Sequence, residues 1–375
     1  MALPKNIKTL IAAILITLLS SNVCALFFRA LNLVISVFTI HYWLIWLLPI
    51  SGLAIWKASR INIFSNAEKL YSPSLAPFIF FSSLLSHITG ASVGRETVSI
   101  QIGGSIANSV LQYFRIDNQF QKTLFNLGVA TGFSTMFSNP IVGAAYLFER
   151  HKERSPITLL FVLTLSYLGI IAADALIGLH TFKPLIIDAN FQEIIKTSII
   201  LFIPSLILIL TYTQIDLFLK KKIQYNPINV ILGSTSLLVF GYLLDNNYYN
   251  TLSLPLLHDA FLYASNPSDF LLKLIFTLIS MHSGFRGGEF VPLMVAGVTF
   301  SSFASTFISS ASLNVFSSLG LYSLVACRFR IPLTCSILIF QYSDWKWATC
   351  SMVFYMTLYH SFKFVNENLL KSIET

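Results

Sequence analysis

The sequence is poor in charge. Asp, Glu, Lys and Arg together make up 11% of its 375 residues, whereas an ordinary soluble domain carries about 25%. Hydrophobic residues make up 55% of the chain, and the mean hydropathy is +0.72. This composition excludes an ordinary soluble globule and predicts a polytopic membrane protein.

Long polar segments are also absent. No stretch between the apolar runs is long or polar enough to form a soluble domain, so we expect one transmembrane domain over 1–375 without a regulatory domain. The basic and then apolar N-terminus has the features of a signal peptide. Apolar character continues well past Ala25, which favours a retained first helix.

Groups that bind metals or catalyse reactions are scarce. Four cysteines lie inside apolar segments without metal-ligand spacing, which favours simple burial. The sequence has no H-E-x-x-H helix, and three of its aspartates are far apart, so neither a metal site, a cofactor nor an enzyme is expected. These cysteines and aspartates are Cys24, Cys327, Cys335, Cys350, Asp174, Asp216 and Asp344.

Apolar runs long enough to cross a bilayer, roughly 20 residues in a helix, fill most of the chain. They predict an all-α fold of about ten to twelve helical segments with very short connections. The candidate segments are 7–38, 42–56, 74–91, 155–180, 190–219, 228–244, 267–281, 290–309, 312–326, 331–342 and 345–362.

Basic residues outnumber acidic ones, 24 to 16. Their collection in short groups between apolar runs is typical of cytoplasmic loops, and it predicts a cytoplasmic N-terminus. Aromatic residues do not alternate with a basic surface patch, so no nucleic-acid partner is expected. The groups are Lys5/Lys8, Arg150/Lys152/Arg154, Lys220/Lys221/Lys222 and Arg328/Arg330.

Glycine and proline interrupt several apolar runs. "GASVGR" precedes the run that begins at residue 96, "HSGFRGGEF" leads into the run at 290, and "RIPLT" opens the run at 331. They predict helices that start inside the membrane, where irregular backbone survives only beside a polar cavity or buried in protein. One such start in each half is typical of an internally repeated transporter. The free N–H groups of these helix starts favour an anion.

These segments resemble the signatures of the CLC family of chloride channels and anion/proton exchangers. "GRETVSIQIGGSIANSV" (94–110) is similar to the family's GREGP-type signature, and "GGEFVP" (287–292) is similar to its glycine-x-phenylalanine-x-proline signature. The flanking strings "SPSLAPFIFFSSLLSHITGASVGRE" and "SDFLLKLIFTLISMHSGFRGGEFVPLM" look most like the fluoride-exporting branch. The resemblance implies a CLC-type inverted-repeat bundle with broken and re-entrant helices, with repeats of roughly 1–187 and 188–375.

The resemblance implies that Glu96 is the gating glutamate, whose carboxylate occupies an anion site when ionised and leaves it when protonated. A carboxylate inside a membrane is costly. Helix N-termini or a bound proton would lower that cost. The alternative is that Glu96 only caps the helix that starts near Thr97, or only pairs with Arg95.

Other anion-binding residues follow from the same resemblance. Arg95 would orient the turn and raise the local positive potential, with a plain ion pair or a snorkelling side chain as the alternative. Gly94 would allow close approach of the backbone. Gly288, Phe290 and Val291 would form the second helix start, with backbone N–H groups facing the anion.

Some positions match the family pattern poorly. Ser59 in "ASRIN" is the nearest counterpart of an early anion-binding hydroxyl, and a solvated helix start is its alternative. His180 lies roughly where proton-coupled relatives carry an acidic residue; it is either a proton relay or a hydrogen-bonded interfacial histidine. Tyr359 or Phe362 would have to replace an expected inner tyrosine. Glu289 is interpreted as a helix cap rather than a proton carrier.

These features predict a halide transporter. The substrate is chloride or fluoride, the chain acts as a channel or as a proton-coupled exchanger, and Glu96 is the gate. The family implies a homodimer, here in a bacterial inner membrane. Thr97 and Val98 replace the Gly-Pro of chloride-transporting relatives, so the selectivity is expected to differ. A family member that has lost transport and serves assembly or membrane structure is the alternative.

Overall fold

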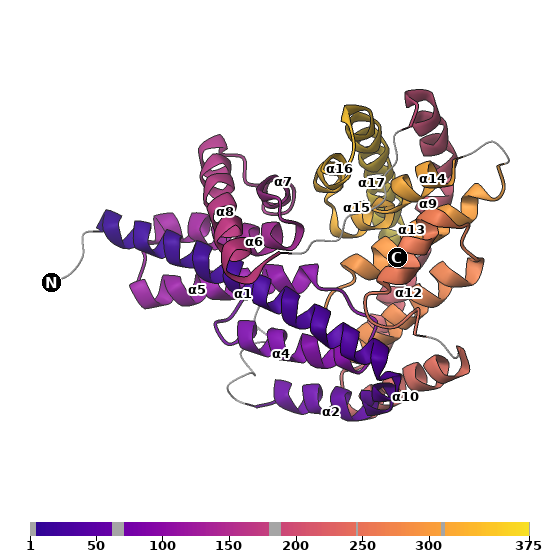
Figure 1. The fold of residues 1–375 in the computed structure, drawn as a ribbon, viewed down its shortest axis with the longest axis horizontal. Helices are drawn as coiled ribbons and strands as arrows, with labels where there is room; N and C mark the ends of the chain where they lie inside the picture. The colour runs from indigo at the N-terminus through magenta and orange to yellow at the C-terminus, as the bar shows by residue number, and fades with distance from the viewer. Residues whose placement is uncertain (1–4, 62–70, 180–188, 245–246, 309–311, 375) are drawn as a thin grey trace.

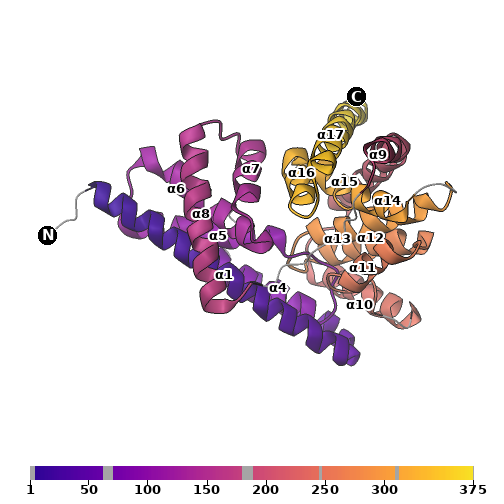
Figure 2. The ribbon, with the colours of Figure 1, turned by 45° about the horizontal axis from the view of Figure 1, so that its top comes forward.

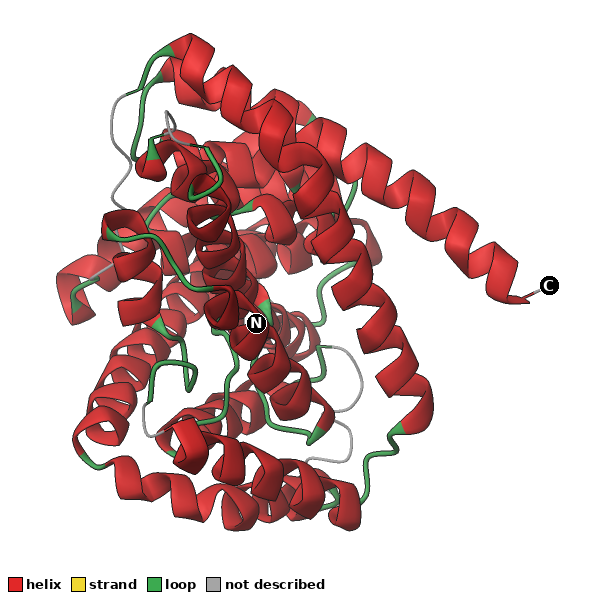
Figure 3. Ribbon diagram, turned by 90° about the vertical axis from the view of Figure 1, so that its right-hand side faces the viewer, coloured by secondary structure: helices red, strands yellow, loops and turns green. Residues whose placement is uncertain are grey.

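The helices of the chain form two groups that meet around broken helices. In this computed structural model, residues 5–61, 71–179, 189–244, 247–308 and 312–374 are described. All regular secondary structure in those ranges is helical, apart from one isolated β-bridge (Figure 3). The predicted all-α fold is therefore confirmed.

The first group lies on the left of Figure 1, in indigo to magenta. The long α1 crosses this group and packs against α5, α6 and α8. Its helices are α1 (Lys5–Ile40), η1 (Tyr42–Leu47), α2 (Leu48–Ser59), α4 (Leu75–Ile88), α5 (Glu96–Phe114), α6 (Asn118–Phe137), α7 (Pro140–Arg150) and α8 (Pro156–Ile177).

The second group lies mainly on the right of Figure 1, in pink to yellow, and the view of Figure 2 shows the same separation. Its helices are α9 (Phe191–Lys222), α10 (Pro227–Leu244), α11 (Leu254–Leu262), α12 (Pro267–His282), α13 (Phe290–Ser305), α14 (Leu313–Gly320), α15 (Ser323–Phe329), α16 (Pro332–Phe340) and α17 (Trp345–Glu374). The groups contact each other where α10 packs on α2, where α16 packs on α7 and where the starts of α5 and α13 meet.

Four of the described helices, α1, α8, α9 and α10, are long and apolar enough to cross a membrane. Only about a quarter of the apolar window is buried in α8, α9 and α10 (28%, 28% and 22%), whereas half of it is buried in α1. Because apolar side chains remain exposed along these three helices, their outer faces suit lipid rather than water.

Several predicted spans are broken in the structure. The segment predicted at 42–56 consists of η1 followed by α2, and the segment predicted at 312–326 divides into α14 and α15. Three helices, α6, α7 and α11, form where no span was predicted, while α17 runs well beyond 362. Short and interrupted helices thus surround the centre, and the long helices lie outside them (Figure 1).

Candidate anion-binding site

The glycine-rich starts of α5 and α13 meet at the centre of the molecule. Gly94 and Gly288 form an isolated antiparallel bridge. The Gly288 N–H donates to the Gly94 carbonyl at 2.8 Å, and the Gly94 N–H donates back to the Gly288 carbonyl. Two segments far apart in the sequence, one in each half, are thereby joined backbone to backbone.

This close approach requires glycine. A Cβ atom on Gly288 would lie 2.4 Å from the Thr97 hydroxyl oxygen, and one on Gly287 would lie 2.5 Å from the Cβ of Val93. The side chain of Thr97 packs directly on Gly288. Thr97 therefore has a structural role at the junction between the halves.

The bridge brings together two helix N-termini that lack side-chain caps. The first N–H groups of a helix have no partner within the helix, and they carry a partial positive charge. In α5 these groups belong to Glu96, Thr97 and Val98, and in α13 to Phe290 and Val291. An anion between the two starts would meet such donors from both halves.

A second pair of hydrogen bonds repeats the symmetry of the bridge. The Ser92 N–H donates to the Ser280 hydroxyl at 2.9 Å, and the Arg286 N–H donates to the Ser86 hydroxyl at 3.0 Å. Each serine lies in the helix that leads into one glycine-rich turn and binds the turn of the other half. The two halves are thus related by reciprocal contacts, as an inverted repeat requires.

The side chain of Glu96 is buried and is bound by its neighbour. Its Oε1 lies 3.2 Å from the Arg95 Nε, and its Oε2 accepts the Arg95 backbone N–H at 3.2 Å. The Arg95 guanidinium also stacks on Phe28, 4.4 Å from the ring centroid. In this structure Arg95 and Glu96 therefore form an ion pair with each other, which was the alternative interpretation of both residues.

A small cavity of about 20 Å³ opens beside Glu96 and holds roughly one water-sized particle. It is lined by residues from six parts of the chain, including both helix starts. The lining residues are Arg95, Glu96, Met136, Phe137, Leu254, Val291, Met294, Tyr322 and Tyr342. Leu254 also lines a cavity of about 270 Å³ next to α1 and the 247–255 loop.

Phe290 anchors an aromatic cluster at the second helix start. Its ring lies 5.4 to 6.5 Å, between centroids, from the rings of Phe133, Phe137, Phe329 and Tyr322. Such distances are typical of edge-to-face and offset aromatic pairs. The ring therefore shapes the wall of the region, while Val291 reaches the small cavity itself.

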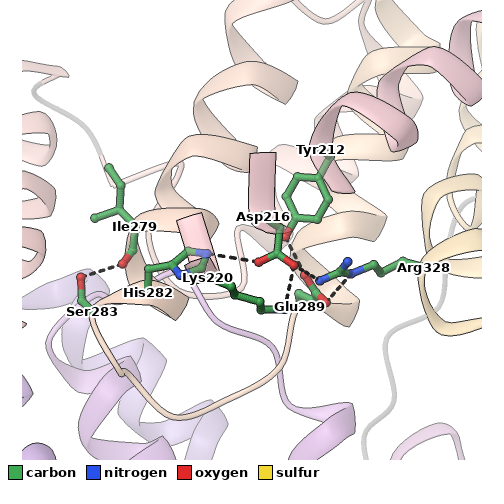
Figure 4. A network of polar contacts seen from close by, with 8 residues as sticks. All are labelled: Tyr212, Asp216, Lys220, Ile279, His282, Ser283, Glu289 and Arg328. Carbon is green, nitrogen blue, oxygen red and sulfur yellow. Dashed lines mark hydrogen bonds and ion pairs between the residues drawn. The ribbon is translucent and has the colours of Figure 1, made fainter. Parts of the chain in front are cut away.

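Glu289 does not cap α13, so the interpretation of its side chain as a cap was wrong. Its carboxylate accepts the Tyr212 hydroxyl and the Arg328 Nε, both at 2.6 Å. Figure 4 shows these groups in one polar cluster, in which Arg328 also pairs with Asp216. Arg328 is therefore part of a buried network and not a free cation of a surface loop, as its place among the basic groups suggested.

The same cluster continues through Asp216. This carboxylate binds Lys220 at 2.7 Å and His282 at 3.1 Å (Figure 4). The network ties α9, α12, α15 and the start of α13 together, and it borders a cavity of about 280 Å³. Glu289 thus faces away from the cavity at Glu96, because it does not line that cavity and is held on the other side by charged partners.

Of the predicted site residues, Arg95, Glu96 and Val291 line the cavity. Ser59 is the last residue of α2, and its hydroxyl donates to the Trp56 carbonyl of the same helix at 2.7 Å. It does not line the cavity at Glu96, so its anion contact remains a prediction. His180 lies outside the described residues. Neither Tyr359 nor Phe362 lines the cavity either, whereas Tyr322 and Tyr342 do.

Two further charged groups, one half-buried and one fully buried, were missed from sequence. Glu149, at the end of α7, accepts the N–H groups of Leu333 and Thr334 at 2.7 and 2.8 Å and so caps α16. Lys273 on α12 is fully buried beside the first glycine-rich turn. A single charge inside an apolar run was the only sequence signal for Lys273.

The fold and this site define an integral membrane protein of two inverted halves, joined at paired broken-helix starts of the kind found in transporters. The sequence profile of the family described as voltage gated chloride channel matches residues 57–359. The chain belongs to this family, also known as CLC.

Individual relatives agree with this assignment. A chloride/fluoride channel protein of Pseudomonas syringae pv. tomato is 26% identical over an alignment that covers 79% of this chain and 72% of the relative. A CLC-type fluoride/proton antiporter superimposes with a TM-score of 0.81 at 21% identity, covering 93% of this chain and 94% of the other. A slow cyanobacterial chloride/proton antiporter gives 0.72 at 20% identity, covering 98% and 99%. These similarities support the predicted inverted-repeat fold.

Proposed function

We propose that the chain moves a small halide across the membrane through the cavity at Glu96. The observation that carries this proposal is the reciprocal Gly94–Gly288 bridge. It places two uncapped helix starts and one buried carboxylate around a single small space. Backbone N–H groups can replace the water that an anion loses there, because their dipoles are fixed and point toward one region.

Glu96 is the proposed gate. Its carboxylate lines the cavity in which an anion would have to lie, so the two compete for the same positive helix starts. Uptake of a proton removes the charge of the carboxylate and with it the attraction to these starts. Proton uptake and anion occupation would then be linked at one side chain, which is the basis for proton-coupled exchange.

The volume of the cavity favours an anion that has lost its water. A space of about 20 Å³ admits roughly one water-sized particle and no hydration shell. We propose fluoride as the preferred substrate and chloride as the broader alternative. The relative named as a chloride/fluoride channel protein and the fluoride/proton antiporter of similar fold support this order.

We further propose a homodimer in a bacterial inner membrane, with the N-terminus in the cytoplasm. The basic groups between helices support the orientation. We also propose Ser59 as an anion contact and His180 as a proton relay. These assignments rest on the family resemblance and on the charge pattern of the loops.

The test is simultaneous recording of halide and proton flux from liposomes that contain the purified protein. Efflux of fluoride, faster than that of chloride and accompanied by proton movement in the opposite direction, is the expected result. Halide efflux without proton movement would overturn the exchanger and leave a channel. Efflux no faster than from empty vesicles would overturn transport and favour a family member with a purely structural role.

A further inference from the structure

Lys273 is a charged side chain with no exposed surface. It projects from α12, and its Nζ contacts the Ser92 hydroxyl in the first glycine-rich turn at 2.8 Å. Burial of an ammonium group is costly unless the group is hydrogen-bonded and its charge is compensated. The partners of Lys273 therefore determine whether its charge is compensated within the protein.

Four neutral oxygen atoms surround the Nζ atom. Two are hydroxyl oxygens, of Ser92 and Ser253, each at 2.8 Å. Two are carbonyl oxygens, of Thr251 at 2.9 Å and Tyr249 at 3.2 Å. Within the described part of the chain, Lys273 forms no ion pair.

The arrangement of hydrogen-bond partners suits the ammonium form. The Ser253 hydroxyl donates its proton to the Asn250 carbonyl at 3.1 Å. The Thr277 hydroxyl donates to the Lys273 carbonyl at 2.7 Å, so the Ser92 hydroxyl must donate to Thr277, 3.1 Å away. Both serine oxygens can therefore only accept from Nζ, as the two carbonyl oxygens do. Four acceptors suit three N–H groups of an ammonium and not the two of an amine.

The nearest acidic residue on the same helix is already engaged. Asp269, one turn before Lys273, accepts the Tyr249 hydroxyl at 2.9 Å and the Asn266 N–H at 2.8 Å. It belongs to the capping box of α12 and points to the helix N-terminus. It is thus committed to other partners.

The carboxylates at the two helix starts also have their own partners. Glu96 is paired with Arg95, and Glu289 is paired with Arg328. The pair Arg95–Glu96 is neutral as a unit. The Lys273 ammonium adds a positive charge next to this neutral pair. Arg286 in the second glycine-rich turn, which stacks on Phe78, adds another. The region is therefore positive overall, which favours a bound anion.

Lys273 also joins two of the segments next to the cavity wall. Ser92 lies two residues before Gly94, and the loop that ends at Ser253 leads directly into Leu254, a lining residue. Thr251 and Ser253 have φ values of 51° and 53°, which are costly for residues with a side chain. The ammonium binds this strained loop to the first helix start.

We propose that the Lys273 ammonium is the fixed counter-charge of the transported anion and so determines how tightly a halide binds beside Glu96. The proposal rests on the proposed halide transport. A buried charge acts on its surroundings beyond hydrogen-bond distance, because the protein interior screens it less than water does. Glu96 and His87 are titratable groups near this turn. His87, in the last turn of α4, binds the Val93 carbonyl at 3.0 Å. Binding is therefore compared at a single pH.

The test is calorimetric titration of fluoride and of chloride into the purified full-length protein. Lys273→Gln, which keeps polar contacts but removes the charge, is expected to raise the halide Kd about tenfold or more. Ser253→Ala removes one acceptor of the ammonium and leaves its charge, so the Kd should stay within about twofold. Equal weakening in both variants would show a structural role only and would overturn the proposal.

A second pair of variants serves if Lys273→Gln does not fold. Ser253→Asp places a carboxylate beside Nζ as a competing counter-charge, and Ser253→Asn is its neutral match. Weakened halide binding with Asp but not with Asn is expected, and equal Kd values for the two would contradict the proposal. If the unaltered protein binds neither halide, the proposed function fails instead, and the two failures are distinguishable.

Discussion

The two glycine-rich helix starts share a backbone plan and differ in charge. Gly94 lies two residues before the first residue of α5, and Gly288 lies two residues before the first residue of α13. Four residues earlier in each turn, Gly90 and Gly284 adopt positive φ values of 91° and 82°. Such values are readily accessible only to glycine. The same turn is therefore built twice.

The similarity extends into the helices. Gly103 and Gly297 are each the eighth residue of their helix. A Cβ on Gly103 would lie 2.1 Å from the Gly128 carbonyl oxygen of α6, and one on Gly297 would lie 2.4 Å from that of Gly320 in α14. Each helix thus uses glycine to pack closely on the next one.

The charges break this symmetry. Where α5 begins with Arg95 and Glu96, α13 begins with Glu289 and Phe290. The first carboxylate lines the cavity, whereas the second is bound on the other side by Arg328. The backbone arrangement of the helix start is common to both halves, but only the first helix start offers a carboxylate to the cavity.

The largest expected effect comes from the glycine that joins the halves. Gly288→Ala would place a Cβ 2.4 Å from the Thr97 hydroxyl oxygen, so the bridge must open. We expect loss of halide flux and destabilisation by about 3 kcal/mol, at the upper end of the cost of overpacking. Flux assays and thermal unfolding in detergent measure the two. The double variant with Thr97→Gly removes the clash and should recover most of both; no recovery would contradict the packing argument.

The polar cluster behind the second start is expected to contribute stability. Arg328→Met leaves Asp216 and Glu289 without their shared cation, which should cost about 3 kcal/mol for a largely buried pair. The midpoint of thermal unfolding should fall accordingly. Arg330→Met, at an exposed neighbouring position, is the control and should be neutral. Equal midpoints for both variants would show that the cluster does not hold the second start.

A smaller effect is expected at the tyrosine of the cavity. Tyr322→Phe removes one hydroxyl from the lining and should change the halide Kd by about fivefold, the value of one hydrogen bond. Tyr359→Phe, at a residue that does not line the cavity, should leave the Kd unchanged. If only Tyr359→Phe altered binding, the site would involve the C-terminal helix, as the family pattern first suggested.

The sequence predicted the helix starts well because their signals are local. Glycine, proline and the Arg-Glu pair are contiguous in the chain, and apolar length predicted the long outer helices. The helix α6 was missed because hydropathy measures composition and not burial. It carries Asn126 and Thr131, which are buried and bonded to His151 and Ser166 in neighbouring segments.

The charged clusters could not be predicted for a different reason. Asp216 and Arg328 are 112 residues apart, and Lys273 and Ser92 are 181 apart. Their pairing depends on how the two halves pack, which no single-sequence pattern encodes. The sequence around Asp216 and around Arg328 does not indicate that the two residues pair. Lys273 is a charge within an apolar run, and the sequence does not indicate its partners.

The role of Glu96 as the gate is tested most directly by measuring proton and halide flux in liposomes for the unaltered protein and for Glu96→Gln. The exposed Glu367→Gln serves as the control for loss of a carboxylate. We expect that Glu96→Gln abolishes proton movement and its pH dependence while halide flux continues, and that Glu367→Gln changes neither. Proton coupling retained in full by Glu96→Gln would contradict the role of Glu96 as the gate between the two helix starts.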